Sequence, residues 1–178
     1  MKQFEGILSD INRKVNRGES PSFDEIVFMY DAADINDLGL MARMMAGELT
    51  GKQVSFVSNM IMNYTNVCNV RCKFCAFYRT GNESDAYTMN IDEVVKHIDQ
   101  YYNSFGLRQL LIQGGVNSNL DLEYYLTLFK TIHEKFPDLG IHGLSASELS
   151  FISRKEKLSI HELLEMLRQA GLETIPGA

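Results

Sequence analysis

Apolar residues recur at helical spacing through the first fifty residues of the chain. Their separation by three or four positions predicts an amphipathic helix over residues 3–16. A capping-box pattern that begins at Ser22 opens a second helix, which we expect to run to about Ala33. A third helix is predicted from Asp34 to a stop at Gly51. None of these helices carries a pattern of reactive side chains, so we expect a structural helical region.

From residue 54 the pattern changes to short apolar strands that alternate with amphipathic helices. Strands are predicted at residues 54–65, 107–113, 139–144 and 172–175. Helices are predicted after Asn90, at 121–136 and at 159–170. The apolar run Leu110-Leu111-Ile112 is typical of a parallel strand covered on both faces. This order predicts an α/β fold with a parallel sheet over residues 53–178, preceded by the helical region at residues 1–52.

Polar or sulfur-containing residues follow three of the predicted strands directly. All three cysteines lie after the first strand, Gln113-Gly114-Gly115 lies after the second, and residues 145–148 lie after the third. Reactive groups gather at the carboxyl ends of the strands in barrels built from alternating strands and helices. We therefore expect these segments to form one site.

Composition and charge restrict the classes of partner. The formal net charge of −6 argues against nucleic-acid binding, which normally requires a basic surface. No apolar run approaches the roughly 18 residues of a membrane span. The first residues turn polar too quickly for a signal peptide, which predicts a cytoplasmic location.

Cys68, Cys72 and Cys75 have the spacing C-x3-C-x2-C, so their thiolates can converge on one metal centre. They can ligate three irons of a [4Fe–4S] cluster and leave the fourth iron open for another ligand. Structural zinc is a weaker interpretation, because zinc ligands usually come in two separated pairs and no histidine lies within twenty residues of Cys75. The odd number of cysteines argues against a disulfide.

The cysteine spacing, the words NYTNVC and FCAFYR and the downstream QGG together resemble the radical S-adenosylmethionine (SAM) superfamily. Within it, residues 34–178 are similar to the dehypoxanthine futalosine cyclases of menaquinone biosynthesis, and the loop is also similar to deazaflavin (F0) synthase subunits. Two departures stand out: Val116, and not an acid, follows the two glycines, and residues 59–62 are more apolar than the family pattern.

The resemblance implies roles for individual residues. The three cysteines would hold the cluster, and SAM would bind its open iron. Phe74, Tyr78, the Gln113-Gly114-Gly115 segment and Glu148 are expected to contact SAM. Alternatively, Phe74 and Tyr78 shield the cluster from solvent, and Glu148 caps a helical turn. His142 is a candidate for substrate contact or proton transfer, because it alternates with Ile141 on the third strand and its ring is therefore expected to point into the barrel.

The resemblance also implies a partial TIM-type (β/α)6 barrel, whereas only four strands are predicted. We therefore expect the N-terminal part of a longer protein, truncated after about the fourth strand. The implied reaction is the closure of a ring in dehypoxanthine futalosine after a 5′-deoxyadenosyl radical abstracts hydrogen. It would need a small-molecule substrate and an external electron donor of the flavodoxin or ferredoxin type. The alternatives are F0 synthase chemistry and a non-enzymatic iron–sulfur or zinc-binding fragment.

Overall fold

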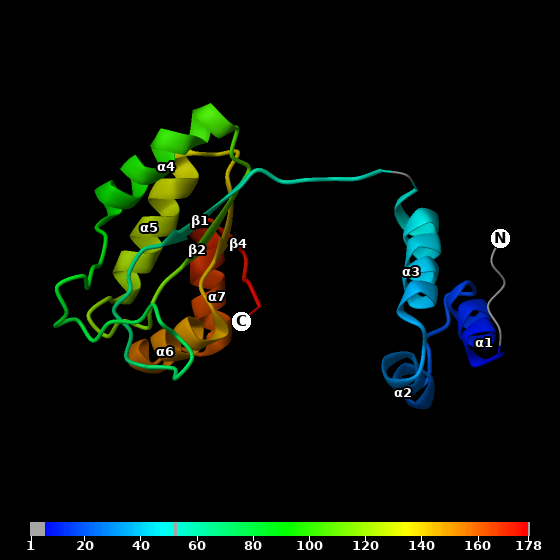
Figure 1. Cartoon of the computed structure of the whole chain (residues 1–178). Coiled ribbons are helices and arrows are strands. Elements are labelled where there is room, and N and C mark those ends of the chain that lie inside the picture. Colours follow the sequence, from blue (N-terminus) through cyan, green and yellow to red (C-terminus); the bar gives the residue numbers. More distant parts are fainter. Residues whose placement is uncertain (1–5, 52, 178) are drawn as a thin grey trace. The chain divides into compact units, whose positions relative to one another are not determined.

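A computed structural model describes residues 6–51 and 53–177. The chain separates into two compact units, Met1–Ser55 and Phe56–Ala178, which are described separately below (Figure 1). This separation lies close to the division between helical and α/β regions that the sequence predicts. Among the described residues, no helix has both the length and the apolar content needed to cross a membrane.

The first unit consists of the three predicted helices. They are α1 (Gly6–Val15), α2 (Phe23–Asp31) and α3 (Ile35–Thr50). The capping box is present, because the Ser22 side chain accepts from the Glu25 amide and the Glu25 carboxylate accepts from the Ser22 amide. Leu8 and Ile11 form its small buried core. The first residues of the predicted helix 3–16 lie outside the described residues.

The second unit alternates strands and helices, as predicted. Its strands are β1 (Asn59–Asn63), β2 (Gln109–Gln113), β3 (Gly140–Gly143) and β4 (Leu172–Thr174). Its helices are α4 (Ile91–Phe105), α5 (Leu122–Lys135), α6 (Ala146–Glu156) and α7 (Ile160–Gln169). The strands pair in the order β1-β2-β3-β4, and every pair is parallel. The predicted parallel sheet is therefore confirmed.

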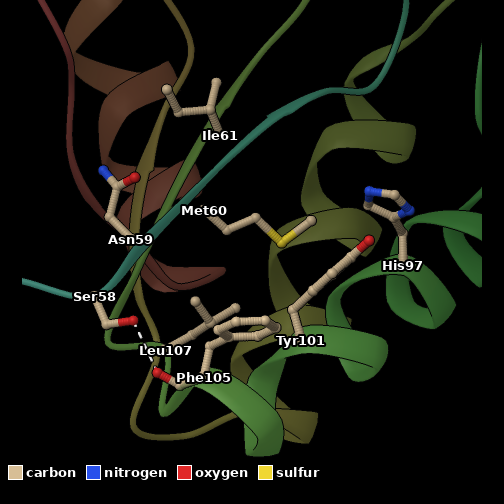
Figure 2. Close-up of a pocket in the computed structure, with 8 residues that line it drawn as sticks. All are labelled: Ser58, Asn59, Met60, Ile61, His97, Tyr101, Phe105 and Leu107. Atoms are coloured by element: carbon tan, nitrogen blue, oxygen red, sulfur yellow. Dashed lines mark hydrogen bonds between the residues drawn. The ribbon is translucent and has the colours of Figure 1, made fainter.

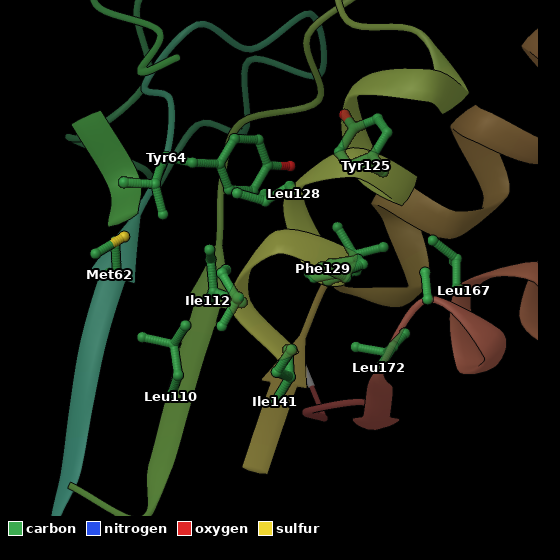
Figure 3. Close-up of a cluster of buried hydrophobic side chains, with 14 of the residues drawn as sticks. Met62, Tyr64, Leu110, Ile112, Tyr125, Leu128, Phe129, Ile141, Leu167 and Leu172 are labelled. Carbon is green, nitrogen blue, oxygen red and sulfur yellow. The ribbon is translucent and has the colours of Figure 1, made fainter. Parts of the chain in front are cut away.

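One face of this sheet packs against helices α4, α5 and α7 and forms the core. Leu110, Ile112 and Ile141 are fully buried on the strand side, opposite side chains such as Phe129 and Leu167 from the helices (Figure 3). Burial of this apolar surface is the main force that holds the helices on the sheet.

The opposite face of the sheet carries no helix among the described residues. Ile61 is 67% exposed, and Leu111 and His142 are partly exposed, although each alternates with a buried neighbour. The prediction that both faces of the second strand are covered is therefore wrong for this chain. One covered face and one open face are the arrangement expected of part of a barrel wall, because the open face corresponds to the barrel interior.

The first strand is shorter than the predicted range 54–65. Asn59 pairs with Gln109, the first residue of β2, and within residues 6–51 and 53–177 β2 is the one strand that pairs with β1. Residues 53–57 pair with no strand in the described part of the chain, so their β-branched side chains do not suffice to make them a strand. At the other end, Tyr64 and Thr65 leave the sheet to begin the cysteine loop.

Helix α6 is longer than the helical turn considered from the sequence. Ser145 and Glu148 form the capping box that starts it, and Leu149 and Ile152 pack into the core. It ends at Lys157, which adopts a left-handed conformation with φ of 57°. Such a conformation usually requires glycine, so the sequence contains no conventional stop signal for this helix.

Two isoleucines on opposite faces of the sheet test where the core lies. Replacement of Ile112, which is fully buried, by alanine should reduce the free energy of unfolding by about 2–5 kcal/mol because it leaves a cavity. The matched control Ile61→Ala removes the same atoms from an exposed position and should change stability by about 0.5 kcal/mol or less. Chemical denaturation of both variants measures the difference, and equal losses would contradict the one-sided core.

Candidate functional site

The carboxyl ends of the first three strands meet at one edge of the sheet, as expected. Asn63 is level with Gln113 in the β1–β2 pairing, and Ile112 is level with Gly143 in the β2–β3 pairing. The cysteine loop, the Gln113-Gly114-Gly115 segment and the start of α6 leave the sheet from these positions. The three predicted segments are therefore brought together.

Gly114 and Gly115, which follow β2, allow the turn after β2 to approach the segment after β1 closely. A β-carbon on Gly114 would lie 2.6 Å from the ring of Tyr64. A β-carbon on Gly115 would lie 2.2 Å from the carbonyl oxygen of Val67 and 2.8 Å from the β-carbon of Cys68. Neither position accommodates a larger side chain without displacement of these neighbours. The glycines thus let the turn after β2 pack directly against the cysteine loop.

Each amide of this turn is used in a hydrogen bond. The Gly114 amide donates to Oε1 of Glu148 at 3.1 Å, and the Gly115 amide donates to the Thr65 carbonyl at 3.0 Å. The Val116 amide donates to the sulfur of Cys68 at 3.3 Å. The turn formed by residues 114–116 therefore contacts the start of α6, the segment just after β1 and a cysteine at the same time.

Backbone hydrogen bonds also hold Cys68 and the next residue, Asn69, in place. The Cys68 amide donates to the Arg79 carbonyl at 2.9 Å, and the Asn69 amide donates to the Val116 carbonyl at 2.8 Å. Arg79 forms a salt bridge with Asp85 at 2.6 Å, and this contact holds the pKa of the Asp85 carboxyl below its usual value. The first cysteine therefore has a defined position between the turn and the far end of its own loop.

Glu148 is 2% exposed, and its carboxylate accepts hydrogen bonds from three segments of the site. Its Oε1 accepts from the Tyr64 hydroxyl at 2.5 Å and from the Gly114 amide, and its Oε2 accepts from the Ser145 amide at 2.7 Å. Burial raises the pKa of the Glu148 carboxyl. Burial, together with the nearby Glu148, also raises the pKa of Tyr64 well above its usual value, so the phenol keeps its proton and donates. The capping interpretation of Glu148 is confirmed, and a contact with SAM stays a prediction.

Thr65 and Asn66, two polar residues just after β1, were given no individual role in the sequence analysis. Their hydrogen bonds nevertheless hold the cysteine loop in place. Asn66 is 5% exposed, and its side chain bonds the Asp85 carbonyl at 2.8 Å and the Tyr87 amide at 2.7 Å. Thr65 is fully buried, and its hydroxyl lies 2.8 Å from both the Tyr87 carbonyl and the Thr88 hydroxyl. Buried polar groups of this kind need partners, so they fix the loop geometry. The available signal was two polar residues immediately after an apolar strand.

The donor chemistry of the cysteine loop fits an iron–sulfur cluster. Cys68, Cys72 and Cys75 are all free thiols and all partly exposed, and thiolates are the usual ligands of such clusters. Within residues 6–51 and 53–177, no three Cys, His, Asp or Glu side chains are already grouped closely enough to hold a metal ion. The ligand assignment stays a prediction.

The structure also gives the positions of the remaining predicted site residues, which are Phe74, Tyr78, Gln113 and His142. Phe74 is 91% exposed at the tip of the loop, and Tyr78 is partly buried near its end. Gln113 is the last residue of β2 and is partly buried. The Nδ1 atom of His142 lies 2.7 Å from the hydroxyl of Thr174, on the open face of the sheet. The structure places His142 where the sequence suggests, and the proposed roles stay predictions.

A separate pocket lies beside the amino-terminal end of β1, away from the cysteine loop (Figure 2). Its lining comes from β1, helix α4 and the segment before β2: Ser58, Asn59, Met60, Ile61, His97, Tyr101, Phe105 and Leu107. The Ser58 hydroxyl donates to the Phe105 carbonyl at 2.9 Å across it. None of the predicted site residues lines this pocket, so it belongs to a different part of the molecule.

Comparison with known proteins relates this arrangement to a family and to whole enzymes. The family model described as the radical SAM superfamily matches residues 62–177. A cyclic dehypoxanthine futalosine synthase from Halalkalibacterium halodurans is 33% identical over 175 residues, covering 98% of this chain and 46% of that protein. A 5-amino-6-(D-ribitylamino)uracil–L-tyrosine 4-hydroxyphenyl transferase from Microcystis aeruginosa is 30% identical over 178 residues, covering 96% of this chain and 47% of that protein.

A solved structure with a similar fold is that of HydG, a maturase of the [FeFe]-hydrogenase. It has a TM-score of 0.64 at 15% identity, and the match covers 96% of this chain and 46% of HydG. The similarity supports the partial barrel that the sequence predicts. The chain spans about half the length of the curated relatives it matches.

The match over most of the α/β unit agrees with the position of the cysteine loop and the glycine turn at the carboxyl edge of a parallel sheet. The resemblance seen in the sequence is therefore confirmed: this chain belongs to the radical SAM superfamily, whose members are enzymes that use a [4Fe–4S] cluster and SAM.

Proposed function

We propose that this chain is part of a radical SAM enzyme of the futalosine and F0 synthase branch, and that it cyclises dehypoxanthine futalosine in menaquinone biosynthesis. The relative with that reaction in its name aligns with nearly the whole chain. The observation that carries the proposal is the cysteine loop at the carboxyl edge of the sheet, packed against the glycine turn after β2.

In this proposal Cys68, Cys72 and Cys75 hold the cluster. When bound, the cluster and SAM supply the radical that abstracts hydrogen from the substrate. The protein residues position these groups and exclude water from them. Phe74 and Tyr78 lie on the same loop as the cysteines, Phe74 exposed and Tyr78 partly buried, and are proposed to cover the SAM side of the cluster.

The substrate would lie against the open face of the sheet. His142 belongs to this face, and its ring is already oriented by the contact with Thr174. An imidazole at that position can accept or donate a proton as a general base or acid. We also propose an external electron donor of the flavodoxin or ferredoxin type and a reducing, cytoplasmic location, since clusters of this kind are reactive toward oxygen.

The second candidate is transfer of the tyrosine side chain to a ribitylamino-pyrimidine, as in F0 synthesis. It is favoured by the similarity to the Microcystis transferase, which is nearly as high as that to the futalosine protein. A non-enzymatic iron–sulfur or zinc-binding fragment is the third candidate. It predicts bound metal without cleavage of SAM.

Removal of one proposed ligand tests the cluster. After anaerobic reconstitution with iron and sulfide, the chain should show broad visible absorption, and Cys72→Ala should lose most of the iron and of this absorption. The control Ser84→Ala changes an exposed residue of the same loop and should keep both. Colourless, iron-poor wild-type protein would rule out the cluster, and zinc retained in its place would favour the structural site.

Turnover distinguishes the reactions. In the whole enzyme of which we propose this chain is part, the reduced, reconstituted protein should form methionine and 5′-deoxyadenosine from SAM and convert dehypoxanthine futalosine to its cyclic product, as measured by liquid chromatography and mass spectrometry. Product from tyrosine with the ribitylamino-pyrimidine, and none from dehypoxanthine futalosine, would support the second candidate. If SAM remains uncleaved while the cluster is present, the binding-fragment proposal is favoured.

A further inference from the structure

The turn at residues 114–116 has a second role besides close packing. Its last amide, that of Val116, donates to the sulfur of Cys68 at 3.3 Å. Of the three cysteines, Cys68 is the one whose sulfur receives such a bond in the described part of the chain. Val116 itself is 5% exposed, so this amide lies away from bulk water.

The position of this amide depends on buried contacts at both ends of the turn. At its start, the Gly114 amide is held by Glu148, whose carboxylate is itself fixed by Tyr64 and by the Ser145 amide. At its end, the Val116 carbonyl accepts from the Asn69 amide.

Glu148 therefore connects to the cysteine loop through the backbone of only three residues. Gly114 and Gly115 have no space to relax toward Tyr64 or Val67, because even a β-carbon would overlap there. A change in the contact at Gly114 is consequently transmitted along the turn to the Val116 amide.

We propose that Glu148 is a positioning residue that holds the 114–116 turn so that the Val116 amide bonds the Cys68 sulfur and raises the reduction potential of the cluster. This inference rests on the proposed ligation of the cluster by Cys68. Hydrogen bonds to the sulfur ligands are one of the factors that set the potential of an iron–sulfur cluster. A donor stabilises the more negative, reduced state more strongly, because hydrogen bonds to charged acceptors are the stronger ones.

The chain offers a matched control for a test at Glu148. Glu162 occupies the equivalent position in the capping box of α7, where it accepts from Ser159, but it is exposed and has no contact with the turn. Both Glu148→Ala and Glu162→Ala remove a capping carboxylate. Only the first removes the acceptor for the Gly114 amide.

The experiment measures the midpoint potential of the reconstituted cluster by a redox titration followed by electron paramagnetic resonance. Glu148→Ala should shift the potential to a more negative value, whereas Glu162→Ala should keep the wild-type value. Glu148→Gln should keep a potential close to the wild-type value, because its amide oxygen can still accept from Gly114. Unfolding temperatures measured in parallel separate a loss of capping, expected in both alanine variants, from the change in potential.

A direct test removes the donor. Val116→Pro has no amide hydrogen and should shift the potential in the same direction as Glu148→Ala. Val116→Ala removes the side chain but keeps the amide, and its potential should stay at the wild-type value.

A second readout does not depend on the cluster. In the metal-free chain, hydrogen exchange of the Val116 amide should be faster in Glu148→Ala than in the wild type and unchanged in Glu162→Ala. This measurement remains decisive if a variant fails to bind iron.

Two outcomes would overturn the inference and are distinguishable. A wild-type chain that binds no iron contradicts the proposed function and this inference together. A wild-type cluster with the same potential in Glu148→Ala and Val116→Pro, or an unchanged exchange rate at Val116, contradicts this inference alone.

Discussion

The site depends on one buried carboxylate that bonds three segments at once. Glu148 accepts from Tyr64 after β1, from Gly114 after β2 and from Ser145 at the start of α6. A buried carboxylate is costly unless it is well hydrogen-bonded, and here the three donors offset that cost. The ends of the first three strands are consequently fixed relative to one another. The cysteine loop begins at the end of β1, so its position follows from this arrangement.

Parallel strand pairing alone places the segments after β1, β2 and β3 at the same edge of the sheet, without any contribution from side chains. Each crossover through a helix returns the chain to the same end of the sheet, so the three strand ends lie side by side. The core on one face then holds helices α4, α5 and α7 away from the other. The other face is the one on which we propose that the substrate binds.

The comparisons with known proteins agree with this arrangement, and they match it to part of each relative. The chain spans about half the length of the relatives it matches, and those relatives carry different reactions on similar sequences. In our proposal, the cysteine loop and the glycine turn of this half serve the cluster and SAM. Choice of substrate would then depend on the open face, where His142 and Ile61 lie.

The sequence by itself determined the alternation of strands and helices, the helix starts at capping boxes and the grouping of reactive segments at strand ends, because these follow from local spacing and chain order. Only the tertiary structure decided that β1 begins at Asn59, where its neighbouring strand begins. Only the structure showed that the glycines face Tyr64 and Cys68, and that Glu148 is buried and bonds the segments that follow β1 and β2. These features depend on contacts between residues up to 84 positions apart, which no local pattern encodes.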